Sequence, residues 1–191
     1  LEHDRIVQAT SSTLSGNQWL GIWHSLTKRG QLTAVPSSAA RATAMMQELR
    51  SLSRLREAEP SYLNAYDRLF RHVSLWLLDH GYQLTSQQPH QTLLQITRHW
   101  QDSAAVTLMI QARHGVKYGE KDEPIEPAVI CLIQLLARFD ADDAQACQSL
   151  LRPHTPSMLS QVFSALPPPD STFLTLAHLR STTHEHASIP T

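Results

Sequence analysis

The sequence predicts an all-α protein, an up-and-down helical bundle with helical extensions at both ends. Apolar residues recur every three or four positions through most of the chain, which is the spacing of a buried helix face. Helix-stop residues such as Gly30, Pro60 and Gly81 interrupt this pattern. No run combines alternating apolar and polar residues with many β-branched side chains. We therefore expect residues 31–35 to form a linker and residues 82–88 a polar loop.

This pattern divides the chain into three parts. Residues 1–59 form an N-terminal arm with one helix capped by Asn17 and a second from about Ala39 to Ala58. Residues 60–139 form the core of the bundle. Residues 140–191 form a helical tail, in which we expect helices over 142–151, 157–166 and 171–179.

The core is expected to contain four helices. The first three run from Tyr62 to His80, from Pro89 to Trp100, and onward from a cap at Asp102 or Ser103. The fourth, from Glu126 to Phe139, is apolar on nearly every side, which is typical of a helix surrounded by others. We therefore expect the fourth helix to be the central one.

The composition excludes several classes of protein. Lys and Arg total 16 against 17 for Asp and Glu, so the net charge of −1 offers no bulk attraction to nucleic acid or to an anionic membrane. Cys131 and Cys147 have no close Cys or His partner, which argues against a disulfide framework and a zinc site. The longest apolar run, 128–137, is about half of what a bilayer span requires. We expect a cytoplasmic protein without metal, cofactor or membrane contact.

Two groups of residues are candidates for binding a partner. Leu69, Trp76 and Leu78 widen the apolar surface of the first core helix beyond one stripe, which predicts contact with more than one neighbouring helix, or with a homodimer or other helical protein partner. The second helix of the arm carries four arginines, which most often form a solvated face and otherwise suit an acidic or phosphate-bearing partner. These are Arg41, Arg50, Arg54 and Arg56.

Arg113 lies on the apolar stripe of the third core helix. A guanidinium there needs a partner or a ligand to offset its desolvation. One interpretation is a salt bridge to an acidic residue that follows, such as Glu120, Asp122 or Glu126. The other is a polar cluster that holds a phosphate and supplies a general acid or base, made of Arg113, His114, Lys117 and Tyr118.

The run from Tyr62 to Gln95 resembles the paired helices of a HEPN domain, in which a long helix ends in Gly, a polar loop follows and a His opens the next helix. His90 stands at that opening. Residues 112–119, ARHGVKYG, resemble the HEPN signature, an Arg followed after four to six residues by a His. Here Tyr118 stands where one form of the signature has that His. The resemblance covers residues 60–139, under half of the chain.

The resemblance implies a bundle that dimerises and brings two copies of the Arg motif into one cleft. Catalytic members are metal-independent ribonucleases, often toxins or phage-defence effectors, in which the Arg binds the scissile phosphate and the His handles the proton. Members without the full motif bind nucleotides or partners. Because a tyrosine hydroxyl is a poor base near neutrality, Tyr118 favours the second group.

Two functions therefore remain open. The first is a non-catalytic interaction or nucleic-acid-associated module of a bacterial defence, toxin–antitoxin or similar complex. The second is a metal-independent ribonuclease with Arg113 on the phosphate and His114, Tyr118 or a more distant His as proton carrier. The lack of net basic charge favours the first.

Overall fold

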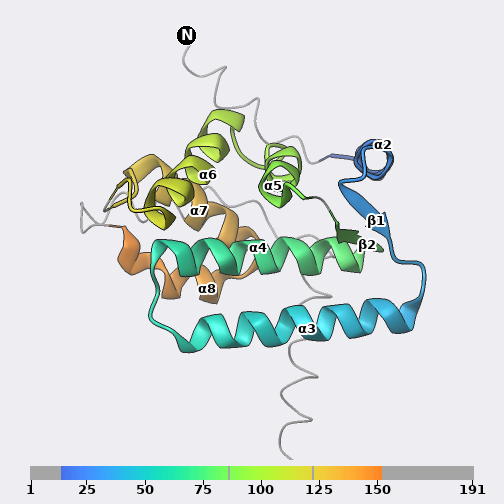
Figure 1. The fold of residues 1–191 in the computed structure, drawn as a ribbon, viewed down its shortest axis with the longest axis horizontal. Coiled ribbons are helices and arrows are strands. Elements are labelled where there is room, and N and C mark those ends of the chain that lie inside the picture. The colour runs from blue at the N-terminus through green and yellow to red at the C-terminus, as the bar shows by residue number, and fades with distance from the viewer. Residues whose placement is uncertain (1–13, 86, 122, 152–191) are drawn as a thin grey trace, which may run out of the picture.

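The computed structural model describes residues 14–85, 87–121 and 123–151, and over these residues the all-α bundle is confirmed (Figure 1). No described helix combines the length and the hydropathy that a bilayer span requires. The helices expected over 157–166 and 171–179 lie outside the described residues. The helices of the bundle are α2 (Gly16–Lys28), α3 (Ser38–Glu57), α4 (Tyr62–Asp79), α5 (Pro89–Thr97), α6 (Ser103–Lys117), α7 (Glu126–Phe139), α8 (Ala141–Ala146) and the 3-10 helix η2 (Gln148–Leu150).

Most helices begin at a side-chain cap that the sequence reveals. Ser61 Oγ accepts a hydrogen bond from the Asn64 amide at 3.1 Å, and Asp102 caps α6 in the same way. The prediction that Asn17 caps α2 is wrong. Ser15 is the cap, because Gln18 three positions later completes a capping box with it.

A two-stranded antiparallel sheet replaces the expected linker and polar loop. Strand β1 (Leu32–Ala34) pairs with β2 (Tyr82–Leu84), with Leu32 opposite Leu84. Each strand follows a helix that ends at a glycine with positive φ, 71° at Gly30 and 88° at Gly81. The chain therefore turns back sharply at two distant points, and a three-residue strand formed this way leaves no local pattern in the sequence.

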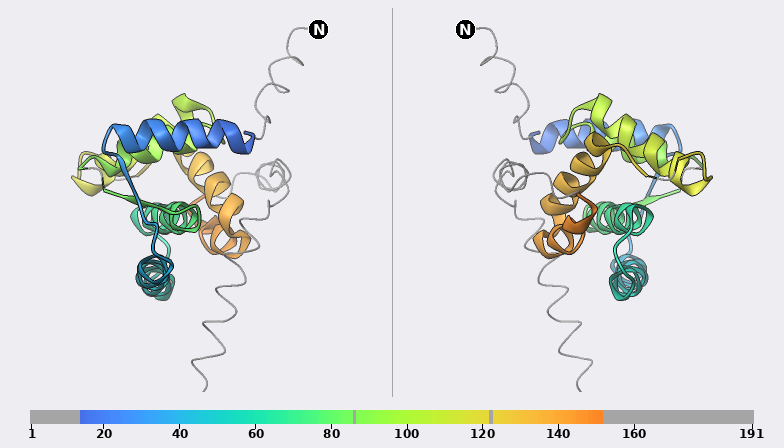
Figure 2. Two further views of the ribbon diagram at one scale, coloured as in Figure 1. Left: turned by 90° about the vertical axis from the view of Figure 1, so that its right-hand side faces the viewer. Right: turned by 90° about the vertical axis from the view of Figure 1, so that its left-hand side faces the viewer.

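Helix α4, and not α7, is the central helix. Twelve of its 18 residues are buried, against eight of 14 in α7. Figures 1 and 2 show α4 lying between α3 on one side and α6 and α7 on the other. The sequence pattern underestimated the burial of α4 because Arg68 and His72 are buried with it.

The expected partner surface on α4 is covered by the chain itself. Leu69, Trp76 and Leu78 are exposed by only 0%, 3% and 2%. Their extra stripe of apolar surface is matched by neighbouring elements of the same chain. Of the two alternatives, contact with more than one neighbour within the chain is therefore confirmed, and contact of these three residues with a second protein is wrong.

The four tryptophans of the chain form one cluster that attaches α2 to the core. Trp19 stacks on Trp23 with ring centroids 5.1 Å apart and meets Trp76 edge-on at 5.0 Å. Trp76 in turn contacts Trp100 at 4.9 Å. These contacts join α2, α4 and the segment between α5 and α6. The helices of the N-terminal arm thus pack directly on the core, α2 through this cluster and α3 along α4.

Candidate functional site

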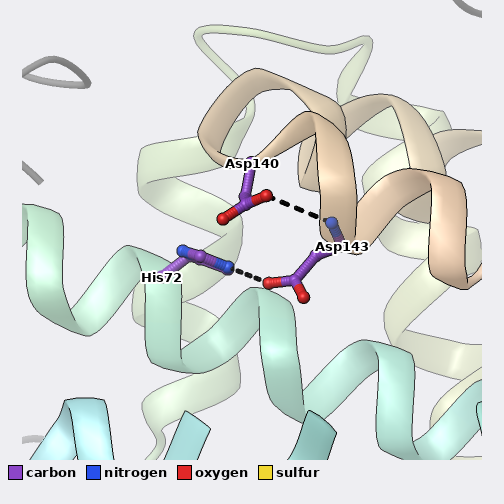
Figure 3. A group of neighbouring side chains, drawn as sticks. All are labelled: His72, Asp140 and Asp143. Atoms are coloured by element: carbon purple, nitrogen blue, oxygen red, sulfur yellow. Dashed lines mark hydrogen bonds and ion pairs between the residues drawn. The ribbon is translucent and has the colours of Figure 1, made fainter. Parts of the chain in front are cut away.

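A buried network of charged groups joins α3, α4 and α8. In Figure 3, His72 and the carboxylates of Asp140 and Asp143 lie side by side. The Nε2 of His72 lies 2.6 Å from Asp143 Oδ2, and because an ionised carboxylate only accepts hydrogen bonds, the imidazole is the donor. Asp140 caps α8, accepting from the Asp142 and Asp143 amides at 2.9 and 3.1 Å.

Two arginines complete the network. Arg56 binds both oxygens of Asp143, at 2.7 and 2.8 Å, and reaches Asp140 at 3.2 Å. Arg68, 2% exposed, lies 3.5 Å from Asp143. Burial alone would raise the pKa of Asp143, but the hydrogen bonds and charges of His72 and Arg56 hold that pKa well below its usual range.

The same residues have the chemistry of metal ligands, since one ligand atom from each of His72, Asp140 and Asp143 fits within 4.8 Å. However, the two guanidinium groups already balance the two carboxylates, and Arg56 occupies both oxygens of Asp143. A divalent ion would have to displace Arg56 and leave a buried excess of positive charge. We therefore interpret this network as structural.

A second polar cluster lies where α4, α5 and α6 meet. The guanidinium of Arg113 lies over the ring of Tyr66 at 5.1 Å, and its Nε is buried without a hydrogen-bond partner. Within the described part of the chain Arg113 forms no ion pair, so the expected salt bridges to Glu120 and Glu126 are absent. Asp122, the third expected partner, lies outside the described residues. The side chain of Arg113 is half-buried and carries a charge.

His90, at the start of α5, contributes an imidazole that can take up a proton to this cluster. Its Nδ1 lies 3.0 Å from the hydroxyl of Tyr66. Partial burial lowers the pKa of His90, Arg113 and Lys117 lower it further, and Asp67 opposes them. Burial also raises the pKa of Tyr66 far above its usual range, so the phenol stays protonated. At neutral pH the cluster therefore combines a neutral imidazole with two cations, Arg113 and Lys117, and with the carboxylate of Asp67 nearby.

The structure separates the residues that the motif had grouped together. Arg113 and Lys117, one helical turn apart, both act on His90, whereas His114 and Tyr118 lie on the next face of α6. The rings of His114 and Tyr118 are 4.5 Å apart, and His114 Nε2 is 3.7 Å from Glu120. Tyr118 is 61% exposed, and Lys117 lies 5.5 Å above its ring.

Sequence reasoning did not include Tyr66 and His90 among the site residues. Tyr66 lies at a buried position in the apolar pattern of α4, so the sequence offered no indication that its hydroxyl belongs to a polar site. His90 was recognised only as the residue that opens α5. Both lie beside Arg113 because α4 and α5 cross next to α6, which is a tertiary relationship.

The four arginines of α3 do not share one binding surface. Arg56 belongs to the buried network, and Arg41 lies near Asp79 and Gly81 at the other end of the helix. Arg50 and Arg54 are exposed. Figure 1 shows α3 separated from α6 by α4, so these arginines and Arg113 cannot bind the same short ligand.

Hollows of two different sizes on the described surface bear on ligand binding. The larger, about 700 Å³, is lined by residues at the start of α4 and α7 and by η2, and includes the carboxylates of Glu123 and Glu126. Those carboxylates make it unsuited to an anion. The smaller, about 200 Å³, lies between α2 and α5 and includes Arg29 and Arg98 but no carboxylate.

No protein-family model matches the chain, and no curated protein or solved structure is significantly similar to it. Any function must therefore be argued from the arrangement of the residues.

Proposed function

We propose that the protein is a non-catalytic nucleic-acid-binding module and that the Arg113 cluster binds a backbone phosphate. The observation that carries this proposal is the guanidinium of Arg113, which is half-buried over Tyr66 and whose Nε has no partner. A desolvated guanidinium has a strong preference for an anion, and its planar fork matches a phosphate. Lys117, one turn along α6, supplies a second cation to the same spot.

Two neighbouring features favour a nucleic acid over a small anion. His90 places the first turn of α5, the positive end of the helix dipole, beside the cluster, and no N-cap side chain accepts a hydrogen bond from that turn. Tyr118 presents a ring that is 61% exposed beside Lys117, and an exposed aromatic ring is a platform on which a base can stack. Although Arg113 and Tyr118 lie on neighbouring faces of α6, we propose that one strand passes over both, with a phosphate at Arg113 and a base on Tyr118.

The test is the affinity of the full chain for a single-stranded oligouridylate, measured by isothermal titration calorimetry at several salt concentrations. We expect Arg113→Gln to weaken binding about tenfold, the usual effect of losing one charge-assisted contact. Lys117→Gln, which changes an exposed side chain, should weaken binding by a smaller factor. Arg113→Lys should recover only part of the loss, because an ammonium lacks the fork.

Arg54→Gln is the matched control, because it removes the same charge from an exposed position on α3. Its affinity should remain within about twofold of the starting value. Equal losses in Arg54→Gln and Arg113→Gln would mean that binding follows net charge alone. No binding by the unaltered chain at low salt would refute the proposal.

The second candidate function is a metal-independent ribonuclease, and His90 is the observation that favours it. When Nδ1 of His90 carries the hydrogen and donates a hydrogen bond to the Tyr66 hydroxyl, the lone pair on Nε2 is free to accept a proton at neutral pH. Arg113 and His90 are also two residues on which the resemblance to HEPN domains rests. Both contact Tyr66, and this proximity supports the proposal of a HEPN-like ribonuclease.

Incubation of the protein with RNA in EDTA separates the two functions. The binding module leaves the RNA intact. Cleavage that is lost in both Arg113→Ala and His90→Gln, but not in His114→Gln, would establish the ribonuclease instead. His114 is the proper control because it is a histidine of the same helix end that faces away from His90.

A further inference from the structure

The outer face of α5 is free of negative charge. From His80 to Gln101 the chain contains no Asp or Glu. Gln91, Gln95 and Arg98 follow one another at helical spacing, and Gln91 and Arg98 are exposed while Gln95 is half-buried. This stripe offers hydrogen-bond donors and acceptors without repelling an anionic chain, although the net charge of the whole protein is −1.

A second cationic site lies at the far end of this stripe. The hollow of about 200 Å³ between α2 and α5 is lined by Arg29, Arg98, Gln95 and His99, with small and apolar residues beneath. The Nη2 of Arg29 donates to Ser25 Oγ at 2.7 Å, which fixes the guanidinium at the edge of the hollow. No carboxylate lines it. A hollow of this size holds several waters, which a phosphate group can displace.

The two cationic sites are separated by the length of α5. His90, beside Arg113, and Arg98 are eight positions apart, which corresponds to about 12 Å along a helix axis. A stacked strand advances about 3.4 Å per nucleotide, so this distance spans about three nucleotides. A mononucleotide cannot reach both sites, whereas a short single strand can.

We propose that a single-stranded nucleic acid lies along α5, with one phosphate at Arg113 and Lys117 and a later phosphate in the α2–α5 hollow at Arg29 and Arg98. This inference rests on the proposed function and extends it by naming the path and the minimum length of the ligand. Gln91 and Gln95 lie between the two phosphates and can contact sugar or base edges. The helical stripe is convex and narrow, which favours a flexible strand over a duplex.

The test compares a two-nucleotide with an eight-nucleotide oligouridylate, both carrying a 5′-phosphate, on the full chain by isothermal titration calorimetry. The longer strand should bind at least tenfold more tightly. The double variant Arg29→Gln/Arg98→Gln should weaken binding of the longer strand about tenfold. It should change binding of the shorter strand by no more than about twofold, because the shorter strand cannot span both sites and still binds at Arg113. Loss of this one phosphate site should also reduce the slope of log K against log salt by about 0.7.

The double variant Arg50→Gln/Arg54→Gln is the matched control, since it removes two exposed arginines from α3. It should bind both strands as the unaltered chain does. Circular dichroism should show the same helicity for both double variants, because the four side chains are exposed.

Each contrary outcome has a distinct meaning. Equal affinity for the two lengths, or no effect of Arg29→Gln/Arg98→Gln on the longer strand, would overturn the path along α5 and leave the phosphate site at Arg113 standing. Tighter binding of duplex RNA, or displacement of the long strand by an equal concentration of polyglutamate, would also overturn it. Failure of both strands to bind would instead remove the proposed function itself.

Discussion

His72 and Asp143 form a 2.6 Å hydrogen bond, although 71 positions separate them in the chain. The bond joins the central helix α4 to the short helix α8, and Arg56 extends the link to α3 through both oxygens of the same carboxylate. One buried aspartate thus connects three helices. A helix of six residues has little stability of its own, so α8 depends on this link for its position.

We predict that Asp143→Asn strongly destabilises the fold. The substitution preserves shape but leaves Arg56 and Arg68 beside a neutral group, and an uncompensated buried charge costs about 3–5 kcal/mol. Asp142→Asn, the adjacent exposed position, should cost about 0.5 kcal/mol or less. Urea unfolding followed by circular dichroism measures both. Similar losses in the two variants would show that the network contributes little.

Stability should fall in acid, and Asp143 should account for part of the fall. The pKa of Asp143 is held below its ordinary value in the folded chain, so ionised Asp143 stabilises the fold above about pH 4, the unfolded value. That contribution is lost progressively as the pH drops further. The free energy of unfolding of the unaltered chain should therefore decrease more steeply below pH 4 than that of Asp143→Asn. Parallel curves would contradict the assignment.

The pKa of His90 should be lower than the ordinary value of 6.5 and should respond to its neighbours. Burial is the largest cause and will persist in surface variants, but Arg113→Gln removes a nearby positive charge and should raise the pKa. Asp67→Asn should lower it further, because a negative neighbour is lost. Imidazole proton shifts in an NMR titration report these changes. If the pKa of His90 is the same in Arg113→Gln, the guanidinium of Arg113 does not lie close to the imidazole.

Two glycine substitutions should have opposite signs. Gly81 has a φ of 88°, a conformation that strains any residue with a Cβ, so Gly81→Ala should destabilise the chain by about 1–2 kcal/mol. Gly21 lies inside α2, and a Cβ added there meets nothing within 4 Å. Gly21→Ala should therefore stabilise the chain by about 0.5–1 kcal/mol. Thermal unfolding measures both variants. If both melting temperatures rise, or both fall, the prediction is refuted.

Local signals in the sequence were sufficient to predict the helices. The bounds of α7, Glu126 to Phe139, agree with the prediction, and Asp102, one of the two expected residues, is the cap of α6. Capping residues and helical periodicity act over a few positions, so a single sequence displays them. The prediction for α8 was less accurate, because the expected helix over 142–151 is interrupted and continues only as η2.

The features that the sequence did not predict all depend on contacts between distant residues. Strands β1 and β2 form only because they pair with each other. The hydroxyls of Thr33 and Thr85, 52 positions apart in the chain, also form a hydrogen bond beside this pairing. Arg68 and His72 have polar side chains that are typical of a helix surface, and they are buried because Asp143, far away in the sequence, pairs with both. Arg113 was identified from its position on an apolar stripe, but its neighbours Tyr66 and His90 come from two other helices.

The gathering of all four tryptophans at one seam determines what intrinsic emission can report. Excitation of indole will sample the seam where α2, α4 and the segment between α5 and α6 meet, because all four tryptophans lie there. Detachment of the arm should shift the emission spectrum strongly. Trp100 also lies 5.4 Å from Phe139, the residue that precedes the Asp140 cap of α8. Loosening that begins at α8 should therefore reach the spectrum through this contact and shift it less than detachment of the arm does.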